Sequence, residues 1–119
     1  MKNSRIEARA LDIVIAYEAR CGRIARPSRR TGFDLESLGP GGPRHIEVKS
    51  SLGVVGRRWL ERAQYLCIRT DPRFFVYTVN NVSSRPRILV FPRRMLLTCF
   101  LRQETKYWFD FHKNHQRES

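Results

Sequence analysis

The sequence lacks long apolar runs, internal repeats and low-complexity blocks. Its longest apolar stretches, residues 11–17 and 74–82, are far shorter than the roughly 18 residues that a membrane-spanning helix needs. The first five residues lead into an amphipathic segment with acidic side chains instead of the continuous apolar core of a signal peptide. We therefore expect a protein that is neither secreted nor embedded in a membrane.

Cysteine is also scarce, with only Cys21, Cys67 and Cys99. Their number is odd, their spacing is wide and no Cys-x-x-Cys occurs, so neither a disulfide framework nor a zinc site is expected. Because their neighbours are apolar, the pattern predicts buried free thiols. Such thiols are typical of a reducing intracellular compartment such as the cytoplasm.

Acidic residues are few: 11 Asp and Glu stand against 23 Lys and Arg, which gives a formal net charge of +12. A field of this sign attracts phosphate polyanions, so we expect a nucleic-acid partner. Nineteen of the basic residues are arginine, whose planar fork binds phosphate oxygens in pairs. The alternative is a GC-rich genome that favours arginine for solubility. A membrane surface is a weaker candidate, because the charges are scattered along the chain.

Periodicity divides the 119 residues, the length of a single domain, into short elements. Helices are predicted over residues 5–21, 57–70 and 92–101. Strands are predicted over residues 31–37, 44–50, 74–82, 87–91 and 107–112, the last at an edge. Residues 23–30 are predicted to form a basic loop, and residues 113–119 a polar tail after a core over 5–112. The order α-β-β-α-β-β predicts one α/β domain with a mixed sheet of four to five strands covered by helices.

The strands over residues 31–37 and 44–50 are separated by a Gly- and Pro-rich segment and are predicted to form an antiparallel hairpin. Side chains alternate along a strand. Phe33 and Leu35, and likewise Ile46 and Val48, are expected to face the core. The opposite face would then collect polar side chains: Asp34, Glu36, Glu47 and Lys49.

Two of these carboxylates are predicted to meet across the hairpin. If its loop is centred between residues 40 and 41, Asp34 sits directly opposite Glu47, with their Cβ atoms about 5 Å apart. Like charges in that arrangement destabilise a hairpin unless a cation lies between them. Carboxylates and the Val48 carbonyl are hard oxygen ligands that suit Mg²⁺ or Mn²⁺.

Lys49 lies beside this pair and could orient an attacking water or stabilise a five-coordinate phosphorus. The sequence thus predicts a metal-dependent catalytic group for phosphodiester hydrolysis, formed by Asp34, Glu47 and Lys49. The alternative is a solvated strand face on which Lys49 neutralises the two carboxylates, since alternation of this sort is common.

A family resemblance supports the catalytic interpretation. Gly32-Phe33-Asp34, followed by Ile46-Glu47-Val48-Lys49 and preceded by a helix with glutamates, resembles the PD-(D/E)XK nuclease superfamily. In that resemblance Asp34 matches the metal aspartate, Glu47 and Lys49 match the (D/E)XK element, and Phe33 replaces the proline. It implies a restriction-endonuclease-like fold, related to Holliday-junction-resolvase-like domains.

A narrower resemblance, over roughly residues 5–95, is to the NO VEIN C-terminal-like domain family. The matching segments are Ala16-Tyr17-Glu18, Gly32-Phe33-Asp34-Leu35-Glu36-Ser37, Ile46-Glu47-Val48-Lys49, Trp59 with Ala63, and Tyr77-Thr78-Val79-Asn80-Asn81-Val82. This family supports the same fold.

Related folds often take a further carboxylate from the first helix, and here Glu7 and Glu18 both compete. They fall on one helix face but about 16 Å apart along the axis, so only one of them can reach the metal. Glu7 lies nearer the position used by resolvase-like nucleases, whereas Glu18 belongs to the Tyr-Glu match, and we favour Glu7. For either residue, the alternative is an ion pair with a nearby arginine.

Six arginines are expected to contact phosphates. Arg57, Arg58 and Arg62 would lie on the second predicted helix, and Arg26, Arg29 and Arg30 in the basic loop. Such contacts would position a duplex without reading its sequence. The alternative is a set of solvated side chains. Trp59 could stack on bases but is expected to lie in the core.

The sequence therefore predicts a Mg²⁺-dependent (or Mn²⁺-dependent) endonuclease acting on DNA in preference to RNA. A chain this short has no room for a separate recognition domain, so we expect recognition of DNA structure, a homodimer or a partner protein. Two rivals remain: a nucleic-acid-binding module on the same fold that does not cut, and a scaffold whose arginines bind an acidic protein.

Overall fold

The computed structural model describes the backbone of residues 2–54, 57–98, 101–102 and 107–110, and the side chains of residues 4–54 and 60–98. Two sheets and three helices form this part of the chain. None of its helices is both long and apolar enough to cross a membrane. The predicted polar tail and Cys99 lie outside the described residues.

The first helix, α1 (Lys2–Arg20), matches the prediction and ends where Gly22 takes a left-handed φ of 79°. The next element is a short strand, β1 (Ile24–Pro27), which pairs antiparallel with β2 (Leu35–Leu38). The predicted basic loop is therefore wrong over residues 24–27. Only one of these four residues is buried, so an edge strand of this kind carries no alternating apolar pattern.

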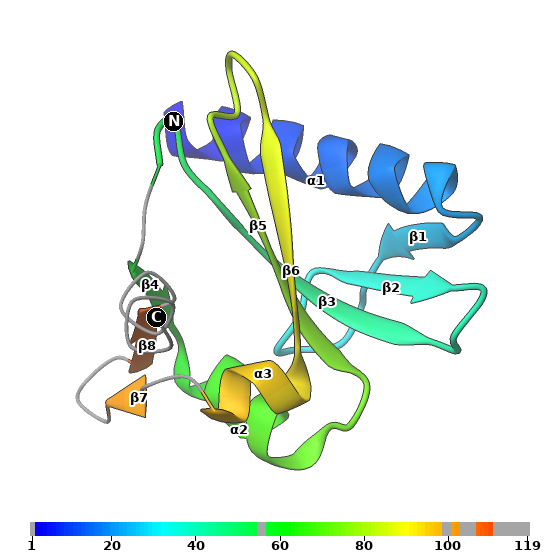
Figure 1. Ribbon diagram of the computed structural model, residues 1–119, viewed down its shortest axis with the longest axis vertical. Helices are drawn as coiled ribbons and strands as arrows, with labels where there is room; N and C mark the ends of the chain where they lie inside the picture. Colours follow the sequence, from blue (N-terminus) through cyan, green and yellow to red (C-terminus); the bar gives the residue numbers. More distant parts are fainter. Residues whose placement is uncertain (1, 55–56, 99–100, 103–106, 111–119) are drawn as a thin grey trace.

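The main sheet is mixed and has five strands in the order β1-β2-β3-β5-β6 (Figure 1). β2 and β3 (Arg44–Ser50) form the predicted antiparallel hairpin. β5 (Phe74–Asn80) runs parallel to β3, and β6 (Arg87–Pro92) runs antiparallel to β5. This arrangement confirms the predicted α/β fold with a mixed sheet.

A second, three-stranded sheet lies beside the first, at the left of Figure 1. It contains β4 (Arg57–Leu60), β7 (Leu101–Arg102) and β8 (Tyr107–Asp110). The prediction that the second helix begins at residue 57 is wrong, because residues 57–60 are extended and pair with β8. Helix α2 (Arg62–Thr70) starts only after Glu61, its N-cap, and α3 (Arg93–Thr98) is shorter than predicted.

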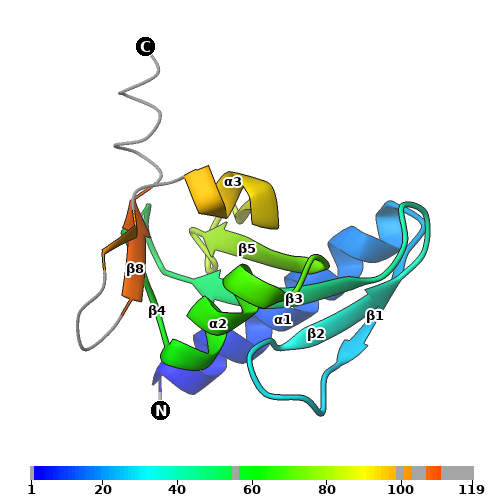
Figure 2. The same cartoon turned by 90° about the horizontal axis from the view of Figure 1, so that it is seen from below.

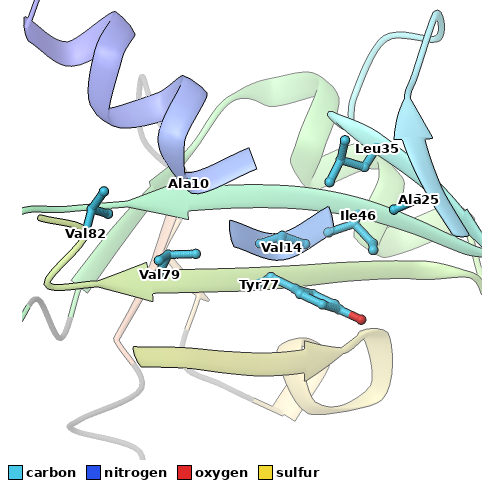
Figure 3. Packing of buried hydrophobic residues seen from close by; sticks show 8 residues of the cluster. All are labelled: Ala10, Val14, Ala25, Leu35, Ile46, Tyr77, Val79 and Val82. Carbon is cyan, nitrogen blue, oxygen red and sulfur yellow. The ribbon is translucent and has the colours of Figure 1, made fainter. Parts of the chain in front are cut away.

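The main sheet is covered on both faces (Figure 2). On one face α1 packs on the cluster drawn in Figure 3: Ala10, Val14, Ala25, Leu35, Ile46, Tyr77, Val79 and Val82. On the other face α2 and α3 pack on a second cluster: Phe33, Leu60, Ile68, Phe74, Val76, Phe91 and Leu96. We call these the α1 face and the α2 face. Successive residues of β3 alternate between them, so both sides of this strand are enclosed.

Two expectations about side-chain direction are wrong. Phe33 and Leu35 were expected to share a face, yet they belong to different clusters. The turn before β2 breaks the alternation and stacks the Phe33 ring on His45, with centroids 4.5 Å apart. Cys21 was expected to be buried but is exposed in the turn after α1; Cys67 is half-buried, and both thiols are free.

Candidate active site

The hairpin brings Asp34 close enough to Glu47 for its charge to act on that side chain. The observed register pairs Leu35 with Ile46, as the centring of the loop predicts, and the ladder ends at that pair, one residue short of Asp34. Asp34 lies just before β2, and its backbone N–H donates to the Ile46 carbonyl at 2.8 Å. Its side chain is held as well, because Oδ2 accepts a 2.9 Å hydrogen bond from the Val48 backbone N–H. Asp34 is thus fixed at the edge of the α2 face.

Glu47 is buried on that face, with only 5% of its surface exposed. Burial, together with the negative charge of Asp34, raises its pKa from 4.5 to about 8, even though Lys49 acts in the opposite direction. The Lys49 ammonium lies 3.5 Å from Glu47 Oε2. We call Asp34, Glu47 and Lys49 the candidate centre. Burial and the Asp34 charge outweigh Lys49 and disfavour the ionised form of Glu47, and a further cation between the two carboxylates would stabilise it.

Gln64, in the first turn of α2, is a site residue that the sequence interpretation missed. Its Nε2 donates to Glu47 Oε2 at 2.7 Å, and its Oε1 accepts from Lys49 Nζ at 3.1 Å. The same Oε1 accepts from the backbone N–H of Glu61 at 2.9 Å. The signal was present: a Gln three residues after an N-cap residue is typical of a helix start. It was hidden because the helix was predicted to begin earlier.

The loop between β1 and β2 adjoins the candidate centre. The Ser28 backbone N–H donates to the carbonyl of Asp34 at 2.8 Å, which ties the loop to the catalytic candidate. Arg29 and Arg30 on this loop are exposed, and the Arg30 guanidinium lies 5.1 Å from the centroid of the Phe33 ring. Arg26 on β1 is also exposed. All three predicted phosphate contacts are therefore exposed, and two of them, Arg29 and Arg30, lie on the loop that is hydrogen-bonded to Asp34.

The other three predicted contacts lie on different elements. Arg62 is exposed on α2, two residues before Gln64. Arg57 and Arg58 were expected on a helix but belong to strand β4, so that part of the prediction is wrong. Their side chains, like that of Trp59, lie outside the described residues.

Glu18 sits on the α1 face, on the opposite side of the sheet from Glu47. It is fully buried, and Ser37 Oγ, the Tyr77 hydroxyl and Arg23 Nε donate hydrogen bonds to it at 2.6, 2.7 and 2.8 Å. Burial alone would raise the pKa of Glu18, but these bonds and the Arg23 charge lower it below its ordinary value. Its neighbours explain Glu18 as a structural anion, and the sheet separates it from the candidate centre.

Glu7 is exposed near the start of α1. With Ile6, it lines a cavity of about 360 Å³ whose other wall is Ser50, Ser51 and Leu52. This wall directly follows Lys49 at the end of β3. Of the two competing glutamates, Glu7 is therefore the one beside the end of the strand that carries Glu47 and Lys49.

A divalent cation would find two carboxylates and a backbone carbonyl at the candidate centre. In the described part of the chain, no three His, Cys, Asp or Glu side chains are grouped so that they could hold a metal ion. The ligands that the sequence predicts at this position are Asp34, Glu47 and the Val48 carbonyl. That set fits Mg²⁺, which commonly binds through one or two carboxylates and keeps several waters. The raised pKa of Glu47 fits too, since a cation would stabilise its ionised form.

Comparison with known proteins identifies the family. A family model described as "Protein NO VEIN, C-terminal" matches residues 6–91 of the chain. The chain belongs to this family. A comparison with curated protein sequences found no match. The NO VEIN C-terminal match includes every residue of the candidate centre, as well as Gln64.

Among solved structures, this NO VEIN C-terminal domain is similar to Hjc, a Holliday junction resolvase from the archaeal hyperthermophile Archaeoglobus fulgidus. The TM-score is 0.62 at 19% sequence identity, and the likeness covers 92% of this chain and 84% of that one. The likeness confirms the predicted fold, a restriction-endonuclease-like mixed sheet flanked by helices.

Proposed function

We propose that this NO VEIN C-terminal domain is a metal-dependent endonuclease that hydrolyses phosphodiester bonds of DNA. The observation that carries the proposal is the juxtaposition of Asp34 with the buried Glu47, whose pKa is raised to about 8, beside Lys49. This burial argues against the alternative of a solvated strand face, where Glu47 would be exposed. Together with Lys49, the Asp34–Glu47 pair forms a group suited to binding a cation and a phosphate.

Asp34, Glu47 and the Val48 carbonyl would hold Mg²⁺ or Mn²⁺. When bound, such an ion lowers the pKa of a coordinated water and neutralises charge that builds on the phosphate oxygens. The backbone N–H of Val48 keeps Asp34 aimed at this position, and Gln64 keeps Glu47 aimed at it. Both carboxylates are therefore oriented before a ligand arrives, which limits the reorganisation that binding requires.

Lys49 contributes a fixed positive charge at the same place. Gln64 Oε1 holds its ammonium 3.1 Å away, and Glu47 lies at 3.5 Å, so the charge stays within the candidate centre. There it would bind a non-bridging phosphate oxygen or the attacking water. Stabilising the negative charge of the five-coordinate transition state is the step that raises the rate.

Several features support DNA as the substrate. The formal net charge of +12 favours a polyanion, and the exposed Arg26, Arg29, Arg30 and Arg62 lie on elements next to the candidate centre. The likeness in fold to a Holliday junction resolvase makes branched DNA a rational member of any substrate panel. Recognition of a branch or assembly as a dimer would supply the selectivity.

The test is cleavage of labelled linear, supercoiled and branched DNA with Mg²⁺, Mn²⁺ or EDTA. We expect cutting that requires the metal, is lost in Lys49→Ala, and is lost in Asp34→Asn while DNA binding persists. A single-stranded RNA control would detect the other nucleic acid. DNA binding without cleavage under every condition would refute the proposed nuclease activity and favour a nucleic-acid-binding module that does not cut. Competition by an acidic protein but not by unlabelled DNA would indicate a scaffold.

A further inference from the structure

Thr78, in the middle of β5, carries a buried hydroxyl that forms no hydrogen bond with the candidate centre. Its side chain is fully buried, and within the described residues its Oγ1 has no hydrogen-bond partner. Burying an unsatisfied hydroxyl destabilises a protein, and a valine would fill the same space without that cost. A hydroxyl in such a position calls for a role beyond packing.

The position of Thr78 relates it to the candidate centre. In the parallel β3–β5 ladder the Cα partner of Thr78 is Lys49, and the pair two positions earlier, on the same face, is Glu47 with Val76. Paired residues of adjacent strands project from the same face of a sheet. Val76 belongs to the cluster under α2, so Thr78 and Lys49 both lie on the α2 face. On its other side Thr78 pairs with Leu89, which is apolar. The polar neighbour of Thr78 in this row of the sheet is therefore Lys49.

Among the described residues, Lys49 has one hydrogen-bond donor that meets no acceptor and is available to Thr78. A lysine ammonium carries three N–H donors, and here they meet Gln64 Oε1 at 3.1 Å and Glu47 Oε2 at 3.5 Å. Thr78 offers an acceptor on the adjacent strand, within the range of a flexible lysine side chain.

We propose that Thr78 is a positioning residue of the nuclease centre, whose hydroxyl accepts a hydrogen bond from the Lys49 ammonium, directly or through one water. The inference rests on the proposed function. When Glu47 gives up its contact with Lys49, Thr78 supplies the replacement that keeps the ammonium beside the reacting phosphate. Because Thr78 is fully buried, it acts through Lys49 and not by touching DNA.

Two conservative variants separate this role from packing. Thr78→Val keeps the shape and removes the hydroxyl, whereas Thr78→Ser keeps the hydroxyl and removes a methyl group. In the metal-free protein, where the Thr78 hydroxyl has no partner within the described residues, we expect Thr78→Val to raise Tm by a few degrees. With metal and DNA present, kcat should fall about tenfold while the Kd for DNA is unchanged. Thr78→Ser should lower Tm and keep most of kcat. Stability and activity would then rank the variants in opposite orders.

A second readout does not depend on catalysis. In a Glu47→Gln background, without metal or DNA, the ¹³Cε NMR resonance of Lys49 should shift on Thr78→Val and stay in place on Thr78→Ser. Cleavage by Thr78→Val at the wild-type kcat, with an unmoved Lys49 resonance, would overturn the positioning role and leave the nuclease intact. A resonance that responds to the hydroxyl in a protein that cuts no nucleic acid would support the Thr78–Lys49 contact and overturn the nuclease.

Discussion

Gln64 donates a 2.7 Å hydrogen bond from the first turn of α2 to the carboxylate of Glu47 on β3, and so joins a helix to the candidate centre. It also accepts from Lys49, which means that one amide sets the geometry of two of the three residues. We expect Gln64→Leu to lower the rate of DNA cleavage about 10- to 100-fold, because both partners lose their orientation.

Glu61→Ala is the matched control for Gln64. It alters the N-cap side chain of α2 but leaves the Glu61 backbone N–H, which donates to Gln64. A cap substitution of this kind costs about 1 kcal/mol of stability and should spare cleavage per folded molecule. Equal losses of activity in the two variants would mean that Gln64 acts only by starting the helix.

The raised pKa of Glu47 predicts a pH-dependent stability. Burial and the Asp34 charge raise this pKa from 4.5 to about 8, so between these values the folded protein keeps a proton that the unfolded chain has released. Without divalent cations, the free energy of unfolding should therefore fall as the pH rises from about 5 to about 8, by roughly 1 kcal/mol per pH unit. Urea unfolding in EDTA at several pH values measures this slope. Glu47→Gln should remove it, and identical slopes in both proteins would contradict the assignment.

Glu18 and Glu7 should respond in opposite ways to removal. Glu18→Ala leaves Arg23 buried without its partner and should cost on the order of 3–5 kcal/mol, with cleavage per folded molecule preserved. Glu7 is exposed, so Glu7→Ala should change stability by less than about 0.5 kcal/mol. If Glu7 supplies the further carboxylate, the same change lowers cleavage about tenfold. Urea unfolding and cleavage assays on the same preparations measure both effects. A loss of cleavage per folded molecule in Glu18→Ala, with none in Glu7→Ala, would reverse the assignment.

Gly32 precedes Asp34 by two residues and permits a turn that other residues would resist. Its φ is +101°, and a Cβ at this position would meet Cys67 Sγ at 2.6 Å. We expect Gly32→Ala to cost more than about 1 kcal/mol and to reduce cleavage beyond the loss of folded protein, because the turn carries Asp34. Adding Cys67→Ala should recover the steric part. Strict additivity of the two changes, measured by urea unfolding, would exclude the contact as the cause.

The loop arginines should determine how DNA binding depends on salt. Each phosphate contact contributes about 0.9 to the slope of log K against log salt concentration. Replacing both Arg29 and Arg30 with Gln should therefore lower that slope by about two, measured by fluorescence anisotropy on linear duplex. The charge-matched control replaces both Arg85 and Arg87, exposed arginines in the turn after β5 and at the start of β6, with Gln and should change it little. Equal changes would indicate binding to net charge alone.

The hairpin and its register were predictable because two independent constraints agree. Alternation assigned Ile46 and Val48 to one side of the second strand, and the Gly- and Pro-rich loop centred the turn, which is enough to pair Leu35 with Ile46 and to bring Asp34 near Glu47. Burial of Glu47 was not predictable in the same way. It depends on α2 packing over that face, a contact between segments far apart in the chain.

The missed strands share a physical cause. β1 buries only Ala25, and β4 draws its hydrogen bonds from residues 107–110, so neither carries a pattern of its own. Over residues 57–70 the spacing of apolar residues suits a helix throughout, although pairing with β8 keeps the first four extended. The partners of Gln64 and the neighbour of Thr78 likewise come from tertiary packing, which local periodicity does not contain.

The alternation of β3 separates what holds this domain together from what it does. Ile46 points to α1 and belongs to the core, while Glu47 and Lys49 point to α2 and belong to the proposed catalytic centre. The second set could be exchanged without disturbing the first. A chain with the same core but Gln and Met in place of Glu47 and Lys49 would fold alike, keep its surface arginines and occupy the same DNA without cutting it. If the domain is the proposed nuclease, such an inactive chain would compete with an active one for the same DNA and protect that DNA from cleavage.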